Sequence, residues 1–303
     1  MRFTVAICTH NRCAALDRAL ASLAHLVVPD GVRWDLVVAD NASEDGTAAT
    51  IARFADTLPI RAITVAEIGK SHALNAVIDV ARGEYILFLD DDVLVDPGWM
   101  RAYHDAFLRF PDVAFFGGPI TPVFEGPRPS WLDGALRHVS NAYAERQLGS
   151  EMIPLEGEAL PYGANWAIRL ADQRRHRYDP RLGRRGDRLF AGEEWAVMEK
   201  LLADGARGRW VPQAHVQHVI PPARQNLGYL RRYYLGNGAS LAIVWEPRGE
   251  PLLLGRPRWV WREAVQQELA YRIRRLYAAP EVWSEHLRRS SVAWGVLWGG
   301  RGG

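Results

Sequence analysis

The first third of the chain alternates short apolar runs with longer segments in which apolar residues recur at helical spacing. The apolar runs predict β-strands at residues 3–8, 34–39, 60–65 and 85–89. The segments between them predict helices at 13–26, 47–55 and 71–81. Strands that are almost wholly apolar and separated by helices are typical of a parallel sheet covered on both faces. We therefore predict an α/β fold with a mostly parallel central sheet flanked by helices.

The pattern changes after the fourth predicted strand. A helix is predicted at 99–110 and an extended segment at 113–116, followed by a Pro- and Gly-rich loop at 119–129. Residues 162–168 fit either a strand or a helix, whereas 194–202 fit a helix. Beyond two adjacent prolines the pattern is helical again, at 227–235, 259–277 and 282–297. The chain is therefore predicted to end in a helical extension.

The composition is that of a globular protein and narrows the function only a little. Of 303 residues, 48% are apolar and 24% are charged, which excludes collagen-like, disordered and disulfide-scaffold proteins. The net charge of +2 requires no nucleic-acid partner, and we expect none. Cys8 and Cys13 lie too close together to staple a domain, so we expect a reducing, cytoplasmic compartment. We also predict no signal peptide and no membrane-spanning segment.

Polar, hydrogen-bonding residues follow each of the four predicted strands. They are Thr9-His10-Asn11-Arg12, the run DNASEDGT at 40–47, Gly69-Lys70-Ser71 at the start of the helix that holds Asn75, and Asp90-Asp91-Asp92. Ligands of parallel α/β sheets bind beyond the carboxyl ends of the strands. We therefore expect these four loops to converge on one polar ligand.

The three adjacent aspartates are the most specific of these signals. Their carboxylates repel one another, and the apolar strand before them fixes their position. Such a cluster is stable when a divalent cation or another positive group neutralises it, so we predict that it binds a metal or a ligand. The sequence motifs of Rossmann dehydrogenases, P-loop proteins, nucleophile-elbow hydrolases and zinc proteases do not occur in the chain.

In this constellation the chain resembles the family 2 glycosyltransferases of GT-A fold. The resemblance rests on six segments in the family's order: VAICTHNR (5–12), VVADNASEDGT (37–47), GKSHALNAVIDVARGEYILFLDDD (69–92), GANWAIR (163–169), GEEWAVMEKLLADG (192–205) and VQHV (216–219). It implies transfer of a sugar from a nucleotide diphosphate, UDP or dTDP above others, to an acceptor hydroxyl. It also implies a nucleotide-sugar-binding half at 1–120, an acceptor-binding half at 121–223 and the helical extension at 224–303.

The resemblance further implies which residues bind the donor and its metal. The aspartates match the family's Asp-x-Asp motif, in which the last carboxylate binds Mn²⁺ or Mg²⁺ and the first faces the nucleoside. A divalent ion at this place stabilises the negative charge of the leaving diphosphate. The implied metal ligands are Asp92, Asp90 and His218. The implied donor-binding residues are Thr9, Asn11, Arg12, Lys70, Asn75, Asp90, Asp91, Asn165 and, at the position that meets the base, Asp40.

The family's general base comes from a Glu-Asp pair at the start of a helix, which here is Glu193-Glu194. The extra methylene of the second residue moves its carboxylate by roughly 1.5 Å relative to an aspartate. We assign the base to Glu194, with Glu193 as the alternative. A single base without a second placed carboxylate favours inversion at the sugar. On composition alone, the two acids would simply complement the positive end of the helix dipole.

The C-terminal segment differs from the rest of the chain in charge. Residues 224–303 carry 13 Arg against 6 Glu, a net charge of +7, and six of the 12 Trp. Arg and Trp interleaved on helices fit peripheral contact with a membrane surface, a homo-oligomer interface, or plain helix packing.

Two other functions stay open on the sequence alone. A nucleotidyltransferase on a related fold would need a basic, Gly-rich loop after the first strand, where the chain has THNRC. A catalytically inactive sugar-nucleotide-binding or scaffold protein is favoured by the replacement of the usual aspartate with Glu194. Likewise, Lys70 fits a solvated side chain as well as a phosphate contact, and His218 fits a structural histidine as well as a metal ligand.

Overall fold

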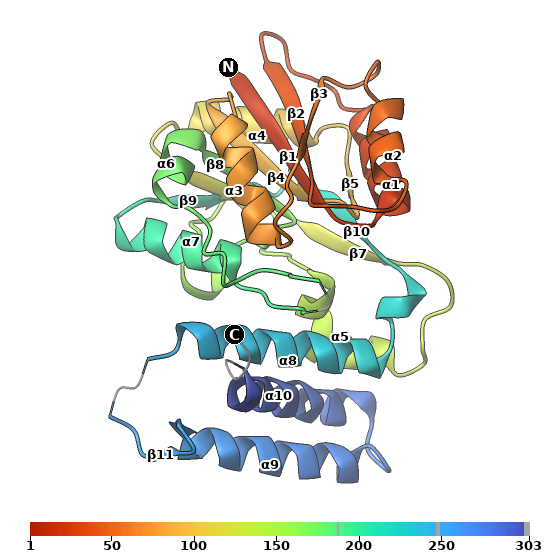
Figure 1. Ribbon diagram of the computed structural model, residues 1–303, viewed down its shortest axis with the longest axis vertical. Coiled ribbons are helices and arrows are strands. Elements are labelled where there is room, and N and C mark those ends of the chain that lie inside the picture. The colour runs from red at the N-terminus through yellow and green to blue at the C-terminus, as the bar shows by residue number, and fades with distance from the viewer. Residues whose placement is uncertain (187, 247–248, 300–303) are drawn as a thin grey trace. The chain divides into compact units, whose positions relative to one another are not determined.

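The four apolar runs near the N-terminus are parallel strands of one sheet in the computed structural model, which describes residues 1–186, 188–246 and 249–299 (Figure 1). The sheet has seven strands in the order β3-β2-β1-β4-β8-β6-β9. Along this order the strands are β3 (Ile60–Thr64), β2 (Arg33–Asp40), β1 (Arg2–Thr9), β4 (Tyr85–Asp90), β8 (Asn165–Arg169), β6 (Phe115–Gly117) and β9 (Gly208–Trp210). Only β8 is antiparallel to its neighbours β4 and β6. The predicted, mostly parallel α/β sheet is confirmed, and the ambiguous segment 162–168 contributes a strand.

A second sheet has three strands in the order β5-β10-β7. These are β5 (Val93–Val95), β10 (Val216–Ile220) and β7 (Ile120–Phe124). The prediction of a loop at 119–129 is therefore wrong over β7. Pro122 hides this strand in the sequence, because a proline lacks the backbone donor of a central strand. β7 lies at the edge of its sheet, where a proline is tolerated.

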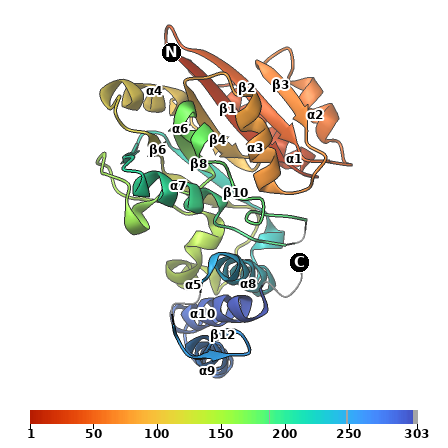
Figure 2. The same cartoon turned by 60° about the vertical axis from the view of Figure 1, so that its left-hand side comes forward.

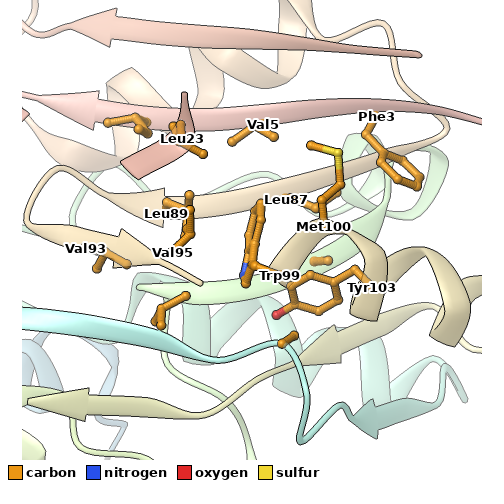
Figure 3. Close-up of a cluster of buried hydrophobic side chains, with 14 of the residues drawn as sticks. Phe3, Val5, Leu23, Leu87, Leu89, Val93, Val95, Trp99, Met100 and Tyr103 are labelled. Atoms are coloured by element: carbon orange, nitrogen blue, oxygen red, sulfur yellow. The ribbon is translucent and has the colours of Figure 1, made fainter. Parts of the chain in front are cut away.

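Helices cover both faces of the seven-stranded sheet. Their bounds are α1 (Cys13–Leu23), α2 (Thr47–Arg53), α3 (Lys70–Val80), α4 (Trp99–Arg109), α6 (Leu170–Arg175) and α7 (Glu193–Ala203). One apolar core joins α1, α2 and α4 to side chains such as Phe3 and Leu87, and Figure 3 shows Trp99, Met100 and Tyr103 of α4 packed into it. A second core lies on the other face, where α3, α6 and α7 pack against alternate residues such as Ala6 and Phe88. Burial of both faces explains why the central parts of β1, β2 and β4 are apolar.

The register of the sheet aligns the ends of the N-terminal strands. Thr9 of β1 pairs with Asp40 of β2, which pairs with Thr64 of β3. On the other side, Cys8 of β1 pairs with Asp90 of β4. The polar segments that follow these strands therefore begin at one edge of the sheet, as the sequence predicted.

The chain forms two units that differ from the predicted division. Unit 1 holds the two sheets and comprises residues 1–123, 144–180 and 193–219, and unit 2 comprises 124–143, 181–192 and 220–303, as far as these are described. The predicted start of the helical extension at 224 lies close to the observed change at 220. Residues 124–143 and 181–192, however, pack with the C-terminal helices. The binding roles given to 1–120 and 121–223 stay predictions.

Unit 2 is helical and contains one short hairpin. Its elements are α5 (Leu132–Val139), a 3₁₀ turn η1 (Ser140–Tyr143), a 3₁₀ turn η3 (Pro222–Arg224), α8 (Leu227–Val244), β11 (Leu252–Leu253), β12 (Arg256–Pro257), α9 (Arg258–Arg274) and α10 (Pro280–Trp298). α10 lies between α8 and α9 (Figures 1 and 2). Gly238 of α8 and Gly295 of α10 face each other so closely that a Cβ on either would meet backbone atoms at 2.2 Å or less. None of the described helices is long and apolar enough to cross a membrane.

Candidate active site

Residues of the loop after β1 hold two of the three adjacent aspartates, Asp91 and Asp92, in place. Asp91 and Asp92 are buried, and both accept from the guanidinium of Arg12, with 2.6 Å between Nη2 and Asp92 Oδ2. Thr9 Oγ1 donates to Asp91 Oδ2 at 2.8 Å. Burial outweighs the attraction of Arg12 and raises the pKa of Asp91 to about 6. The loops after β1 and β4 thus converge, as predicted, through charge-assisted hydrogen bonds.

Lys70, the first residue of α3, joins the acidic run to the start of α7. Its Nζ lies 3.0 Å from Asp90 Oδ1, 2.8 Å from Glu194 Oε1 and 3.5 Å from Glu193 Oε1. Burial alone would lower the pKa of Lys70, but the three carboxylates more than offset it and raise that pKa well above its usual range. Lys70 is therefore an engaged, permanently charged group and not a solvated side chain.

The two glutamates at the start of α7 differ in their surroundings. Glu193 is 3% exposed, and burial together with the neighbouring Glu194 raises its pKa to about 8. At neutral pH it is therefore mostly protonated. Glu194 is partly exposed and accepts directly from Lys70. Of the pair, Glu194 is the acid within hydrogen-bond distance of the Lys70 ammonium.

Gly163 makes the space that the Glu194 side chain occupies. A Cβ built on Gly163 would lie 2.1 Å from Glu194 Oε1 and 2.3 Å from its Cδ. The absence of a side chain at this position lets the longer acid fit where the family has an aspartate. From the sequence, Gly163-Ala164-Asn165 matches a family segment that lines the donor sugar and the acceptor. The space that Gly163 leaves for Glu194 could not be predicted, because it depends on the distance between two segments far apart in the chain.

His218 of β10 lies beside the last aspartate. Its Nε2 is 3.2 Å from Asp92 Oδ2, and both residues are buried. His215 lies elsewhere, between Asp96 at 2.9 Å and Thr121 at 2.8 Å. Among residues 1–186, 188–246 and 249–299, no three His, Cys, Asp or Glu side chains form a group that could hold a metal ion. Asp92 and His218 thus lie side by side, while Asp90 is engaged by Lys70.

The loop after β2 is ordered by hydrogen bonds to its own side chains. Asp40 Oδ1 accepts from the N–H of Ser43 at 3.0 Å. Asn11, which has a left-handed φ of 52°, accepts at Oδ1 from the N–H of Glu44 at 2.7 Å. Asn41, which sequence analysis left without a role, accepts from the N–H of Gly69 and donates to the carbonyls of residues 65 and 67. Asp40 and Asn11 thus share one ordered segment at the sheet edge.

Two predicted donor-binding asparagines hold the fold together instead. Asn165 is fully buried, and its Oδ1 accepts from Trp99 Nε1 and Tyr103 Oη, both at 2.9 Å. Its Nδ2 donates to two carbonyls, so all four hydrogen bonds of the amide are used within the protein. Asn75 Nδ2 and Oδ1 bind the backbone of Tyr178 at 2.9 and 3.0 Å. We therefore leave Asn165 out of the donor site and treat Asn75 as a residue that positions Tyr178.

Tyr178 is a further buried polar residue that sequence analysis did not single out. Its hydroxyl has no hydrogen-bond partner among the described residues. Burial raises its pKa well above the usual range, and the charges of Glu194 and Lys70 act on it. It therefore adds a neutral donor to the surroundings of the two charged groups.

Comparison with known proteins places this arrangement in a family. The model of the family described as glycosyl transferase family 2 matches residues 4–153. The succinoglycan biosynthesis protein ExoM of Rhizobium meliloti is 24% identical over 245 residues, which are 79% of this chain and 74% of that protein. Validoxylamine A glucosyltransferase of Streptomyces hygroscopicus subsp. limoneus is 31% identical over 102 residues, 33% of this chain and 22% of that protein.

Solved structures agree at the level of the fold. The mannosyltransferase PcManGT from Pyrobaculum calidifontis, in complex with GDP-Man and Mn²⁺, superposes with a TM-score of 0.62 and 19% identity over 98% of this chain and 87% of that one. TarS 1-349 of S. aureus, in complex with UDP-GlcNAc, superposes with a TM-score of 0.53 and 14% identity over 98% of this chain and 91% of that one. Residues 4–153 of the chain therefore match glycosyl transferase family 2, and the chain is a glycosyltransferase of GT-A fold.

Proposed function

We propose that this glycosyltransferase is metal-dependent and inverting, and that its donor is a sugar linked to a nucleoside diphosphate, UDP above others. The observation that carries the proposal is the placement of Glu194, 2.8 Å from Lys70, whose Nζ also lies 3.0 Å from Asp90. Lys70 thus brings the proposed base, Glu194, close to the first of the three adjacent aspartates, Asp90. That is the arrangement expected where a donor diphosphate and an acceptor hydroxyl come together.

The donor would bind along the strand ends. Asp40, fixed by the N–H of Ser43, is proposed to accept a hydrogen bond from the base. Arg12 and Lys70 supply positive charge where the diphosphate would lie, and Thr9 keeps Asp91 turned toward Arg12. The ligands in complex with the two structural neighbours, GDP-Man with Mn²⁺ and UDP-GlcNAc, support a nucleotide sugar.

Asp92 and His218 are the residues that would hold the divalent ion, with Asp90 as a predicted third ligand. Their oxygen and nitrogen atoms lie 3.2 Å apart, as two ligands of one Mn²⁺ or Mg²⁺ can. When bound, such an ion stabilises the charge that develops on the leaving diphosphate. Arg12 contacts both Asp91 and Asp92 and so lowers the repulsion between their carboxylates.

Glu194 is proposed to be the general base. The acceptor oxygen attacks the anomeric carbon, the bond from that carbon to the phosphate oxygen breaks, and the acceptor proton moves to the Glu194 carboxylate. The neighbouring Glu193 is buried and mostly protonated at neutral pH, so it neither takes this proton nor acts as a nucleophile. A single displacement inverts the anomeric centre. The acceptor is proposed to be a hydroxyl of a glycan, a lipid-linked sugar or a small molecule, in the cytoplasm.

The test begins with a screen of nucleotide sugars for hydrolysis and thermal stabilisation, with and without Mn²⁺. For the donor that responds, Glu194→Gln keeps the size of the side chain but removes its basicity. We expect kcat to fall by about 10²-fold or more, with UDP affinity measured by titration calorimetry nearly unchanged. Glu199→Gln is the matched control, because Glu199 is an exposed residue of the same helix.

Three outcomes would contradict the proposal. A wild-type protein that binds UDP with Mn²⁺ but turns over no donor would point to the inactive, scaffold alternative. Release of pyrophosphate from a nucleoside triphosphate would point to a nucleotidyltransferase. A Glu194→Gln variant with normal turnover beside an inactive Glu193→Gln variant would move the base to Glu193.

A further inference from the structure

The helix α9 is apolar on two faces. Val260, Ala264 and Tyr271 are buried in the packing of unit 2. On the opposite face, Val265, Leu269, Ile273 and, just past the end of the helix, Leu276 are 52 to 86% exposed. Their spacing of three or four residues places these side chains on one stripe. The outer face of a solvated helix carries polar residues, so this stripe has no explanation in the packing of the chain itself.

The hairpin before α9 adds three exposed leucines. Leu252, Leu253 and Leu254 lie at the end of β11 and in the turn to β12, and Leu254 is 68% exposed. Leu254 has a left-handed φ of 51°, a conformation that favours Gly, Asn or Asp over a bulky side chain. Trp261 Nε1 donates to the carbonyl of Leu253 at 2.9 Å and ties the hairpin to α9. Neither burial nor backbone preference accounts for a leucine at this turn.

The charged residues around these side chains are of one sign. Every charged side chain classed as exposed between residues 251 and 277 is an arginine: Arg258, Arg262, Arg272, Arg274 and Arg275. The two acids of this segment, Glu263 and Glu268, are only partly exposed and pair mainly with side chains of α8 and α10. Glu263 accepts from Arg289 of α10, and Glu268 accepts from Ser290 of α10, from Arg231 of α8 and from Arg272. We call the surface formed by the exposed side chains of residues 252–277 the Arg–Leu face.

We propose that the Arg–Leu face docks on the surface of a membrane that contains anionic lipids. The leucines of the hairpin and the stripe of α9, with Trp259 beside them, would enter the boundary between headgroups and acyl chains. The arginines would meet the lipid phosphates as bidentate partners. Apolar side chains bordered by basic ones, without exposed acids, are what binding to an anionic lipid surface requires.

Charge also decides against a second copy of the chain as the occupant. A symmetric pairing of two Arg–Leu faces would bring ten arginines together with no exposed acid from residues 251–277 to neutralise them. An anionic lipid surface supplies the missing negative charge at every position. The proposal concerns unit 2 alone and does not depend on the identity of the sugar donor.

The experiment is co-sedimentation of the full chain with vesicles of phosphatidylcholine alone and of phosphatidylcholine mixed with phosphatidylglycerol. We expect binding to the mixed vesicles and little to the neutral ones. Leu254→Asp removes an apolar contact and adds a negative charge, and should weaken binding tenfold or more. Leu108→Asp is the matched control, because Leu108 is 60% exposed on α4 of unit 1.

The double variant Arg258→Gln, Arg262→Gln tests the electrostatic part. Each arginine near an anionic surface contributes about fivefold in affinity, so the pair should lose about 25-fold, and added salt should weaken the wild type similarly. All these positions are exposed, so the variants should fold, which circular dichroism checks. The proposal would be overturned by equal binding to neutral vesicles or by unchanged binding of the variants. Failure of the wild type to bind either kind of vesicle would also overturn it. If light scattering then showed a dimer that Leu269→Asp converts to a monomer, the face would be an interface between two copies of the chain.

Discussion

The substitution Gly163→Ala tests the proposed base through the space around it. The added Cβ would lie 2.1 Å from Glu194 Oε1, so the carboxylate must move by about 1 Å to reach an ordinary contact distance. Gly163 does not have a left-handed φ, so the backbone accepts an alanine without strain. The nearest atoms all belong to a flexible side chain, which can move without disturbing the sheet. The substitution should therefore displace the base while leaving the fold intact.

The size of the effect follows from that displacement. Moving a reacting group by about 1 Å can reduce the rate by about 10²-fold, within the 10²–10⁴-fold that a general base contributes. The same movement would weaken the 2.8 Å contact between Glu194 and Lys70. We therefore expect kcat to fall by about 10²-fold, with UDP affinity nearly unchanged because the base acts in the transition state.

A second substitution makes this prediction specific. Glu194→Asp shortens the side chain by one methylene and restores the family's usual residue, so it should keep part of the activity. It should also ease the clash with the new Cβ, because the closest contact, to Oε1 at 2.1 Å, is withdrawn and the Cγ position at 2.8 Å is left to adjust. The double variant Gly163→Ala, Glu194→Asp should then turn over as fast as Glu194→Asp alone, within about twofold. Gly98→Ala is the control, because a Cβ there meets nothing within 4 Å.

The assay is the steady-state rate with the donor found in the screen, together with titration calorimetry of UDP. A Gly163→Ala enzyme with wild-type kcat would refute the reasoning, because the carboxylate would have moved without effect. A double variant much slower than Glu194→Asp would show that Gly163 acts through something other than the space it leaves for Glu194.

Three further predictions concern other groups of the site. Asp92→Ala should abolish the Mn²⁺ dependence of UDP binding while the thermal unfolding temperature stays close to that of the wild type, and unchanged affinity with Mn²⁺ would remove Asp92 from the metal site. Asp40→Asn should weaken UDP binding equally with and without Mn²⁺, which calorimetry at both conditions checks. The third follows from the pKa of Glu193, which burial raises to about 8, so the native state keeps a proton that the unfolded chain loses above about pH 4.5. The stability that this group contributes is fully present below about pH 4.5 and is lost as the pH rises through about 8. Glu193→Gln should therefore flatten the fall in unfolding temperature between about pH 5 and pH 9. The control Glu199→Gln should leave that fall unchanged.

Much of the fold was predictable because local pattern and burial agree in the N-terminal part of the chain. The apolar runs that become β1, β2 and β4 are largely buried, so their composition alone marks them as strands, whereas the edge strand β3 is only partly covered. β7 was missed because Pro122 masks an edge strand. The grouping of α5 with the C-terminal helices was missed because the residues that pack there are far apart in the sequence.

The candidate site was predictable in its residue types and less so in its contacts. Parallel strand ends meet at one edge, so the contact of Thr9 with Asp91 follows from topology. The contact of Lys70 with Glu194, and the space left by Gly163, depend on distances that no local pattern encodes. Asn165 is the opposite case, because this polar residue inside a family motif makes all four hydrogen bonds of its amide within the protein, which no sequence motif reveals.

The separation of these partners along the chain bears on how the site comes into existence during folding. Thr9 and Asp91 are 82 residues apart, and Lys70 and Glu194 are 124 residues apart. Closing loops of that length is entropically unfavourable until the strands between them have paired, so the site cannot form ahead of the sheet. A fragment ending near residue 120 would hold Asp90, Asp91 and Asp92. It would lack Glu193, Glu194 and His218. The proposed nucleotide site therefore needs the whole of unit 1, and a nucleotide bound there would stabilise that unit cooperatively against unfolding.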